Sequence, residues 1–91
     1  MPQGLVLIRT AGPWDQDTLP AGLQRSHRTA GGVWGMLRVI RRVVGFHLGA
    51  CPPLAGVLAV GSAQPIPPGV QHDITVTGPA RLVVEFWGRH R

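Results

Sequence analysis

The sequence predicts an all-β domain, and three observations support this fold class. The 91 residues include 13 Gly and 9 Pro, which is too many for a helical bundle but suits short strands joined by tight turns. Apolar, β-branched runs return at roughly ten-residue intervals, a spacing typical of sandwiches and barrels. Hydrophobic residues make up 44% of the chain, which is enough for a packed core. We therefore expect one small β-domain.

Each apolar run is a candidate strand. The strongest covers 33–40, and Arg41-Arg42 is the expected turn into a return strand. Gly78-Pro79 is the expected turn of the last hairpin. The expected strands are 4–9, 33–40, 43–48, 54–60, 73–77 and 81–87. The segment 66–70 is expected to be extended, and its prolines confine it to an edge or a bend. We divide the domain, 1–91, into an extended N-terminal arm (about 1–30), a barrel (about 31–88) and a short basic tail (89–91).

Composition limits the function classes. The lone Cys51 excludes an internal disulfide, and we interpret it as a small loop residue rather than a nucleophile. Neither a signal peptide nor an apolar run of the roughly 18–20 residues that span a membrane is present, so we expect a cytoplasmic protein without membrane contact. The formal charge is +5, but the nine arginines are scattered, which argues against a nucleic-acid surface.

The segment from Gly61 to His72 is the most informative part of the chain. Five residues separate Gly61 from Pro67, one separates Pro67 from Gly69, and two separate Gly69 from His72. This spacing resembles the second motif of the cupin superfamily, whose fold is a double-stranded β-helix, a jelly-roll-like barrel. The resemblance implies that the bend aims His72 at one barrel mouth as a metal ligand. Val76 stands where the family has an asparagine.

A longer ordered series resembles the small cupin-like domain of the tellurite-resistance protein B family, over roughly 8–88. At the turn after 39–40 that family has an acidic residue and a glycine, whereas this chain has Arg41-Arg42. Larger members carry a methyltransferase after this domain, and we expect none here. The series is Pro13-Trp14-Asp15, Leu19-Pro20, His27, Gly32-Val33-Trp34-Gly35, Pro67-Pro68-Gly69 with His72, and Val84-Glu85-Phe86.

A two-residue turn at Gly78-Pro79 would place His72 opposite Glu85. Directly opposed residues share a face, with Cβ atoms about 4.5–5.5 Å apart. Trp87 would then share the interior face with Glu85. The other face, formed by Leu82, Val84 and Phe86, would be an exposed apolar stripe, which predicts cover by the arm or by a second subunit in a homodimer.

These positions suggest a metal site. Glu85 lies within an apolar run, and a buried carboxylate needs a partner. It could coordinate a metal with His72, bond His72 or an arginine without metal, or lie exposed. The resemblance implies His27 as a third ligand, although His27 also fits an exposed loop. Two histidines and a carboxylate leave open positions on a divalent metal, here Zn, Fe, Mn or Ni, and a metal-free protein remains an alternative.

Two functions follow as hypotheses. The first is a small metal-binding cupin that captures an oxyanion or small metabolite, related to tellurite, metal or oxidative stress, with Arg38 and Trp87 contacting the ligand. The second is a metal-free module whose basic surface binds an acidic partner or nucleic acid. His47 and His90 are interpreted as surface or tail residues. No catalytic triad, carboxylate pair or phosphate loop is evident, so the sequence leaves catalysis open.

Overall fold

The computed structural model describes residues 1–25, 27–50 and 52–89, and the side chain of His27 is not among the described parts. Cys51 and the tail residues His90 and Arg91 therefore lie outside the described residues. Almost all regular structure is strand, so the all-β prediction is confirmed. One short 3-10 helix, η1 (Ala21–Gln24), lies between β1 and β2. In the described part of the chain, no helix has the length and apolar character of a membrane span.

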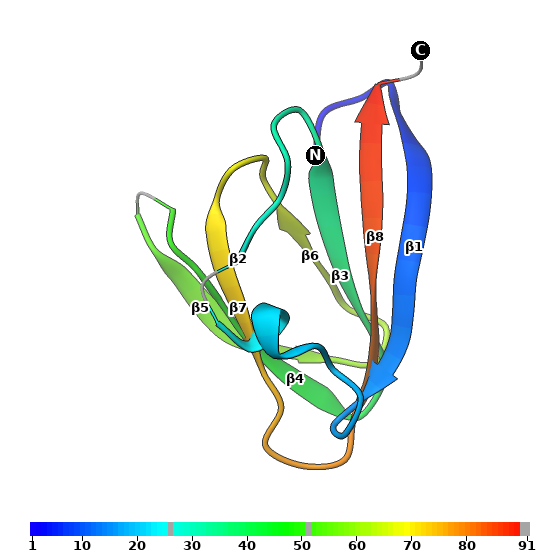
Figure 1. Ribbon diagram of the computed structural model, residues 1–91, viewed down its shortest axis with the longest axis vertical. Coiled ribbons are helices and arrows are strands. Elements are labelled where there is room, and N and C mark those ends of the chain that lie inside the picture. Colours follow the sequence, from blue (N-terminus) through cyan, green and yellow to red (C-terminus); the bar gives the residue numbers. More distant parts are fainter. Residues whose placement is uncertain (26, 51, 90–91) are drawn as a thin grey trace.

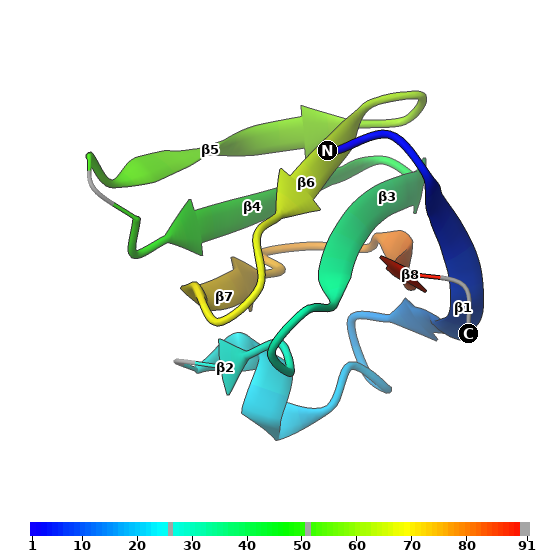
Figure 2. The same cartoon turned by 90° about the horizontal axis from the view of Figure 1, so that it is seen from above.

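Two antiparallel sheets of four strands face each other (Figures 1 and 2). The first sheet has the order β1 (Leu5–Asp15), β8 (Arg81–Arg89), β3 (Trp34–Arg41), β6 (Ala63–Ile66). The second has the order β2 (His27–Arg28), β7 (Gln71–Thr75), β4 (Val43–Leu48), β5 (Leu54–Ala59). The described strands thus form an open sandwich and not a closed barrel.

Two predicted hairpins are wrong, because the chain changes sheet at both turns. β3 pairs with β6 and β8, whereas β4 pairs with β5 and β7. Arg42 makes the corner between β3 and β4 with φ of 60°. Residues 76–80 carry the chain from β7 in one sheet to β8 in the other. The two corners line a common cavity, so they meet at one end of the sandwich.

The core lies between the sheets, where the inward faces of both alternate with outward residues. On β8 the inward residues are Leu82 and Val84, which are 0% and 4% exposed. This reverses the predicted orientation of β8, since Val83, Glu85 and Trp87 consequently occupy the outer face. The apolar stripe expected to be covered by the arm or by a second subunit faces this core, with Leu82 and Val84 inside it and Phe86 packed against it. The core residues are Leu19, Leu37, Val39, Val44, Leu48, Leu58, Ile66, Ile74, Ala80, Leu82 and Val84.

The segment predicted to be an extended N-terminal arm, about 1–30, contains a strand of the first sheet. β1 is an integral edge strand, paired with β8 from Leu5↔Arg89 to Asp15↔Arg81. Beyond it, the Asp15 carboxylate accepts hydrogen bonds from the N–H groups of Asp17 at 2.8 Å and Thr18 at 2.9 Å, which turns the chain toward η1. The Asp17 hydrogen bond, against some desolvation and helped by Thr18 and the charge of Arg81, lowers the pKa of Asp15 below its usual 3.8.

The glycines of the Gly61–His72 motif act as the sequence predicts. Gly61 and Gly69 have φ of 88° and 72°, a region that only glycine adopts without strain. The N–H of Val70 donates to the carbonyl of Pro67 at 3.3 Å and closes the bend before β7. The bend connects β6 in one sheet to β7 in the other, and His72 follows it directly on β7.

Candidate functional site

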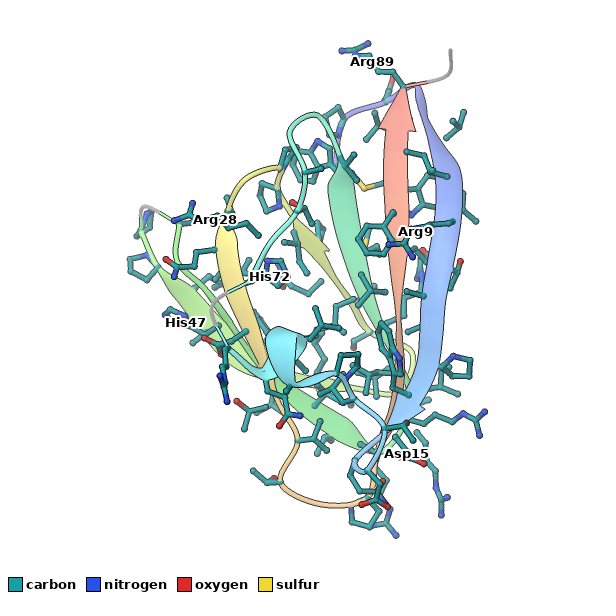
Figure 3. The ribbon with its side chains drawn as sticks, in the orientation of Figure 1. Arg9, Asp15, Arg28, His47, His72 and Arg89 are labelled. Carbon is teal, nitrogen blue, oxygen red and sulfur yellow. The ribbon has the colours of Figure 1, made fainter. Side chains whose placement is uncertain are left out.

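His72 projects from β7 into the space between the sheets, where it is 3% exposed (Figure 3). Its Nδ1 lies 3.0 Å from the carbonyl oxygen of Val70. A carbonyl can only accept a hydrogen bond, so this nitrogen carries the proton and donates. The backbone of His72 pairs with His27 on β2 and with Leu48 on β4. The backbone register therefore brings two of the predicted ligands opposite each other.

Glu85 lies elsewhere. It projects from the outer face of the other sheet, where its Oε1 accepts a hydrogen bond from Arg38 Nε at 2.8 Å. The same oxygen accepts a second one from Trp87 Nε1 at 3.2 Å. Arg38, Glu85 and Trp87 thus form one polar cluster on the outer face, and the opposition of Glu85 to His72 predicted from the hairpin is wrong. Of the alternatives considered for Glu85, the structure has the bond to an arginine.

No group of three or more His, Cys, Asp or Glu side chains within the described residues could hold a metal ion. The carboxylate that was to complete the predicted site is on the far side of a sheet from His72. The side chain of His27 lies outside the description, so metal binding by His27 and His72 stays a prediction. His47 is on the outer face of β4, half-exposed, with Nδ1 3.6 Å from Asp73 Oδ2, in agreement with a surface role.

A cavity of about 270 Å³ lies between β1 and β8 on one side and the segment that follows β2 on the other. Its lining is mainly apolar, with two arginines and one hydroxyl. Arg9 comes from β1 and Arg28 from β2, so the two sheets each contribute a cation; Figure 3 shows them on opposite sides of the space between the sheets. The lining residues are Ile8, Arg9, Arg28, Thr29, Ala30, Val33 and Phe86.

Each polar group of this pocket is held in place by a neighbouring residue of the fold. The guanidinium carbon of Arg9 lies 4.3 Å from the centre of the Phe86 ring, a cation–π contact. Arg28 Nη1 donates to the carbonyl of Gly69 at 2.9 Å. The Thr29 hydroxyl, in a residue only 6% exposed, donates to the carbonyl of Pro67 at 3.2 Å. The residues after β2 are thereby tied to the Pro-Gly bend.

Neither arginine is neutralised within the part of the chain that the structure describes. The ion pairs among the described residues join Glu85 to Arg38 and Asp73 to His47. Arg9 and Arg28 therefore bring two positive charges to one partly open, apolar pocket, and neither has a carboxylate partner among the residues that the structure describes. Such an arrangement attracts anions, because an apolar wall weakens the screening of a charge by water.

Comparison with known proteins identifies the family. The family model of the TehB-like domain matches residues 9–84. This chain belongs to the TehB-like family. Among curated protein sequences, none matches it significantly.

Solved structures share the fold of this TehB-like chain. A protein from E. coli (strain K12) superposes with a TM-score of 0.88 at 22% identity, over 100% of this chain and 97% of that one. TehB from Haemophilus influenzae superposes with a TM-score of 0.85 at 20% identity, over 98% of this chain. The match covers 33% of the TehB chain, so this chain spans about a third of the length of that protein.

Sequence reasoning missed the pocket of this TehB-like domain. Arg9, Arg28 and Phe86 are far apart along the chain, and no short motif joins them. One signal was available in Arg9, which ends an apolar run on a strand that itself becomes a sheet edge. The pairing of β1 with β8, which places Arg9 against Phe86, is a long-range contact that local patterns do not encode.

Proposed function

We propose that this TehB-like chain binds a small anion, either an oxyanion or an anionic metabolite, in the pocket between its two sheets. The observation that carries the proposal is the pair Arg9 and Arg28, which line one apolar cavity without a carboxylate partner among the described residues. A guanidinium group stays charged at all physiological pH values and offers five N–H donors. The family relation to tellurite resistance agrees with such a ligand, since tellurite is itself an oxyanion.

The fixed geometry of the pocket supports binding over mere surface charge. Arg28 is bonded to Gly69 and Arg9 is stacked on Phe86, so less side-chain entropy is lost when a ligand binds. The other arginine with a strong contact, Arg38, is neutralised by Glu85 on the outer face. The contact between Arg38, Trp87 and a ligand that the sequence suggested is therefore replaced in this proposal by Arg9 and Arg28.

Chemical-shift mapping by NMR tests the proposal. Uniformly ¹⁵N-labelled protein is titrated with tellurite, selenite, phosphate, acetate and benzoate at constant ionic strength. We expect at least one anion to shift the amides around residues 8–9, 28–30 and 33. Arg9→Gln and Arg28→Gln should each weaken this binding at least tenfold, because a hydrogen bond to a charged group contributes about 1.5–3 kcal/mol.

Arg41→Gln is the matched control, since it removes the same charge from an exposed position at the far end of β3. It should leave the titration unchanged. Amide chemical-shift changes around surface arginines such as Arg41 and Arg89, with no loss of anion binding in Arg9→Gln and Arg28→Gln, would overturn the proposal. They would instead favour the metal-free module that binds an acidic partner or nucleic acid, whose binding falls steeply with salt.

A divalent metal (Zn, Fe, Mn or Ni) held by His72 with His27, in a cupin-type fold, is a second proposal. Its support is the bond from His72 Nδ1–H to the carbonyl of Val70, the kind of contact that commonly orients metal-ligating histidines. Elemental analysis of untagged protein after reconstitution with each metal tests it. Stoichiometric metal that is lost in His72→Gln and kept in Glu85→Gln is expected, whereas substoichiometric metal in the wild type would reject it.

A further inference from the structure

We infer that the ligand of this pocket is a small organic carboxylate with an apolar body, and not a bare inorganic oxyanion. The inference rests on the proposed anion site and adds the chemical class of its ligand. It follows from three properties of the cavity: the composition of its wall, its volume, and the way in which its cations are presented.

The wall of the pocket is suited to an apolar body. Four of its seven lining residues are Ile8, Ala30, Val33 and Phe86. A bare oxyanion can bond the two arginines, but it would lose water along these side chains, which offer it no hydrogen bond, and this loss opposes its binding. An apolar body gains about 25 cal/mol for each Å² of apolar surface that leaves water. The wall therefore favours a ligand that combines a charged end with a hydrophobic remainder.

The volume limits the size of that body. Liquid water takes about 30 Å³ per molecule, so a cavity of about 270 Å³ holds roughly nine waters or a similar number of non-hydrogen atoms. Pockets for drug-sized ligands occupy about 300–1,000 Å³. This comparison favours ligands smaller than nucleotides and other large cofactors. Short-chain and single-ring carboxylates, such as hexanoate and benzoate, are of the right size.

The two arginines of the pocket offer hydrogen-bond donors that suit a planar carboxylate group. The guanidinium carbon of Arg9 lies over the Phe86 ring, and no described residue accepts a hydrogen bond from the N–H donors along the guanidinium edge. A carboxylate accepts two parallel hydrogen bonds from such an edge. Arg28 uses one donor for Gly69 and keeps others, and the Thr29 hydroxyl can accept a hydrogen bond while it donates to Pro67.

Isothermal titration calorimetry on the full chain tests the inference with benzoate and hexanoate as carboxylate probes, and with phosphate, sulfate and tellurite as inorganic ones. We expect both carboxylates to bind at least tenfold more tightly than every inorganic anion. Arg9→Gln should weaken carboxylate binding at least tenfold, and Arg41→Gln should have no effect. Val33→Thr, which replaces a methyl group by a hydroxyl of similar size, should weaken benzoate severalfold and leave phosphate unchanged. Circular dichroism checks that each variant folds.

Two results would overturn the inference, and they differ in what they leave standing. Inorganic anions that bind as tightly as benzoate, with the same dependence on Arg9 and Arg28, would refute the carboxylate class and keep the proposed anion site. Probes that do not bind, or that bind equally to the Arg9 and Arg28 variants, would refute both. Equal loss of benzoate and phosphate binding in Val33→Thr would also refute the role of the apolar wall.

Discussion

The orientation of β8 decides which side chains face the space between the sheets, and two neighbouring valines test it. Val84 is 4% exposed and belongs to the core, whereas Val83 is half-buried on the outer face. Val84→Ala and Val83→Ala remove the same atoms from adjacent positions of one strand, so differences in β-propensity and in the unfolded chain cancel. The pair therefore measures burial on the two faces.

The magnitude follows from the lost contacts. Removing two buried carbon groups costs about 0.8 kcal/mol each, or about 1.6 kcal/mol, and the cavity left at Val84 adds up to about 1 kcal/mol. We expect Val84→Ala to lower the free energy of unfolding by about 2–2.5 kcal/mol and Val83→Ala by about 0.5–1 kcal/mol. At about 0.05–0.15 kcal/mol per residue, 91 residues give a total of roughly 5–14 kcal/mol, so both variants fold.

Urea denaturation followed by tryptophan fluorescence measures both values. With an m-value of about 2 kcal/mol/M, the midpoint should fall by about 1 M for Val84→Ala and by less than half of that for Val83→Ala. An unchanged m-value shows that the comparison is one of stability. A loss for Val83→Ala that equals or exceeds the loss for Val84→Ala would refute the orientation, and would return Glu85 and Trp87 to the interior.

Three further predictions concern the corner, the turn and the outer cluster. Arg42→Gly should raise the free energy of unfolding by about 0.5–1 kcal/mol. A residue other than glycine in the left-handed region costs roughly 1–2 kcal/mol, and the greater chain entropy of glycine in the unfolded state offsets part of the gain. Arg41→Gly, inside β3, should lower the free energy of unfolding. Because the pKa of Asp15 is lowered in the folded protein, its ionised carboxylate stabilises the fold above pH 3.8, and this stabilisation is lost as the pH falls below that value. Asp15→Asn should therefore flatten the decline of the urea midpoint between pH 5 and pH 3. An unchanged decline in the variant would contradict this role of Asp15. Glu85→Gln should cost less than about 1 kcal/mol in urea denaturation. The Glu85 side chain is 18% exposed, but Arg38 is 45% exposed, and an ion pair with such a solvated partner is weak. A loss of several kcal/mol would indicate that Glu85 faces the interior between the sheets.

The sequence was sufficient for the strands but not for their pairing. Gly78-Pro79 is typical of a tight hairpin, yet residues 76–80 connect two different sheets. A short linker with turn residues fits both a hairpin and a corner, and only the long-range pairing of β8 with β1 and β3 distinguishes them. Arg41-Arg42 poses the same ambiguity, since a corner and a hairpin turn can both use a left-handed residue.

The orientation of β8 shows how a functional hypothesis can override a simpler pattern. Between Leu82 and Trp87 both faces of the strand are apolar apart from Glu85, and the usual interpretation places the face with the charge toward solvent. The predicted hairpin at Gly78-Pro79 favoured the opposite choice, because its register placed Glu85 opposite His72, the residue that the cupin resemblance directs to the interior. The structure follows the simpler rule: Leu82 and Val84 enter the core, and Glu85 finds its partner in Arg38.

The Pro-Gly bend, which the sequence linked only to His72, also supports the anion pocket. β2 has two residues and pairs only with β7, so it is a short edge with few backbone hydrogen bonds of its own. The side chains of Arg28 and Thr29 add bonds to the carbonyls of Gly69 and Pro67, both of which belong to the bend. The glycine at 69 is needed for the bend, and the bend places both carbonyls where these side chains reach them. The Pro-Gly bend thus positions both His72 and the wall of the anion pocket. The pocket therefore depends on the bend, although no residue of the bend lines the cavity.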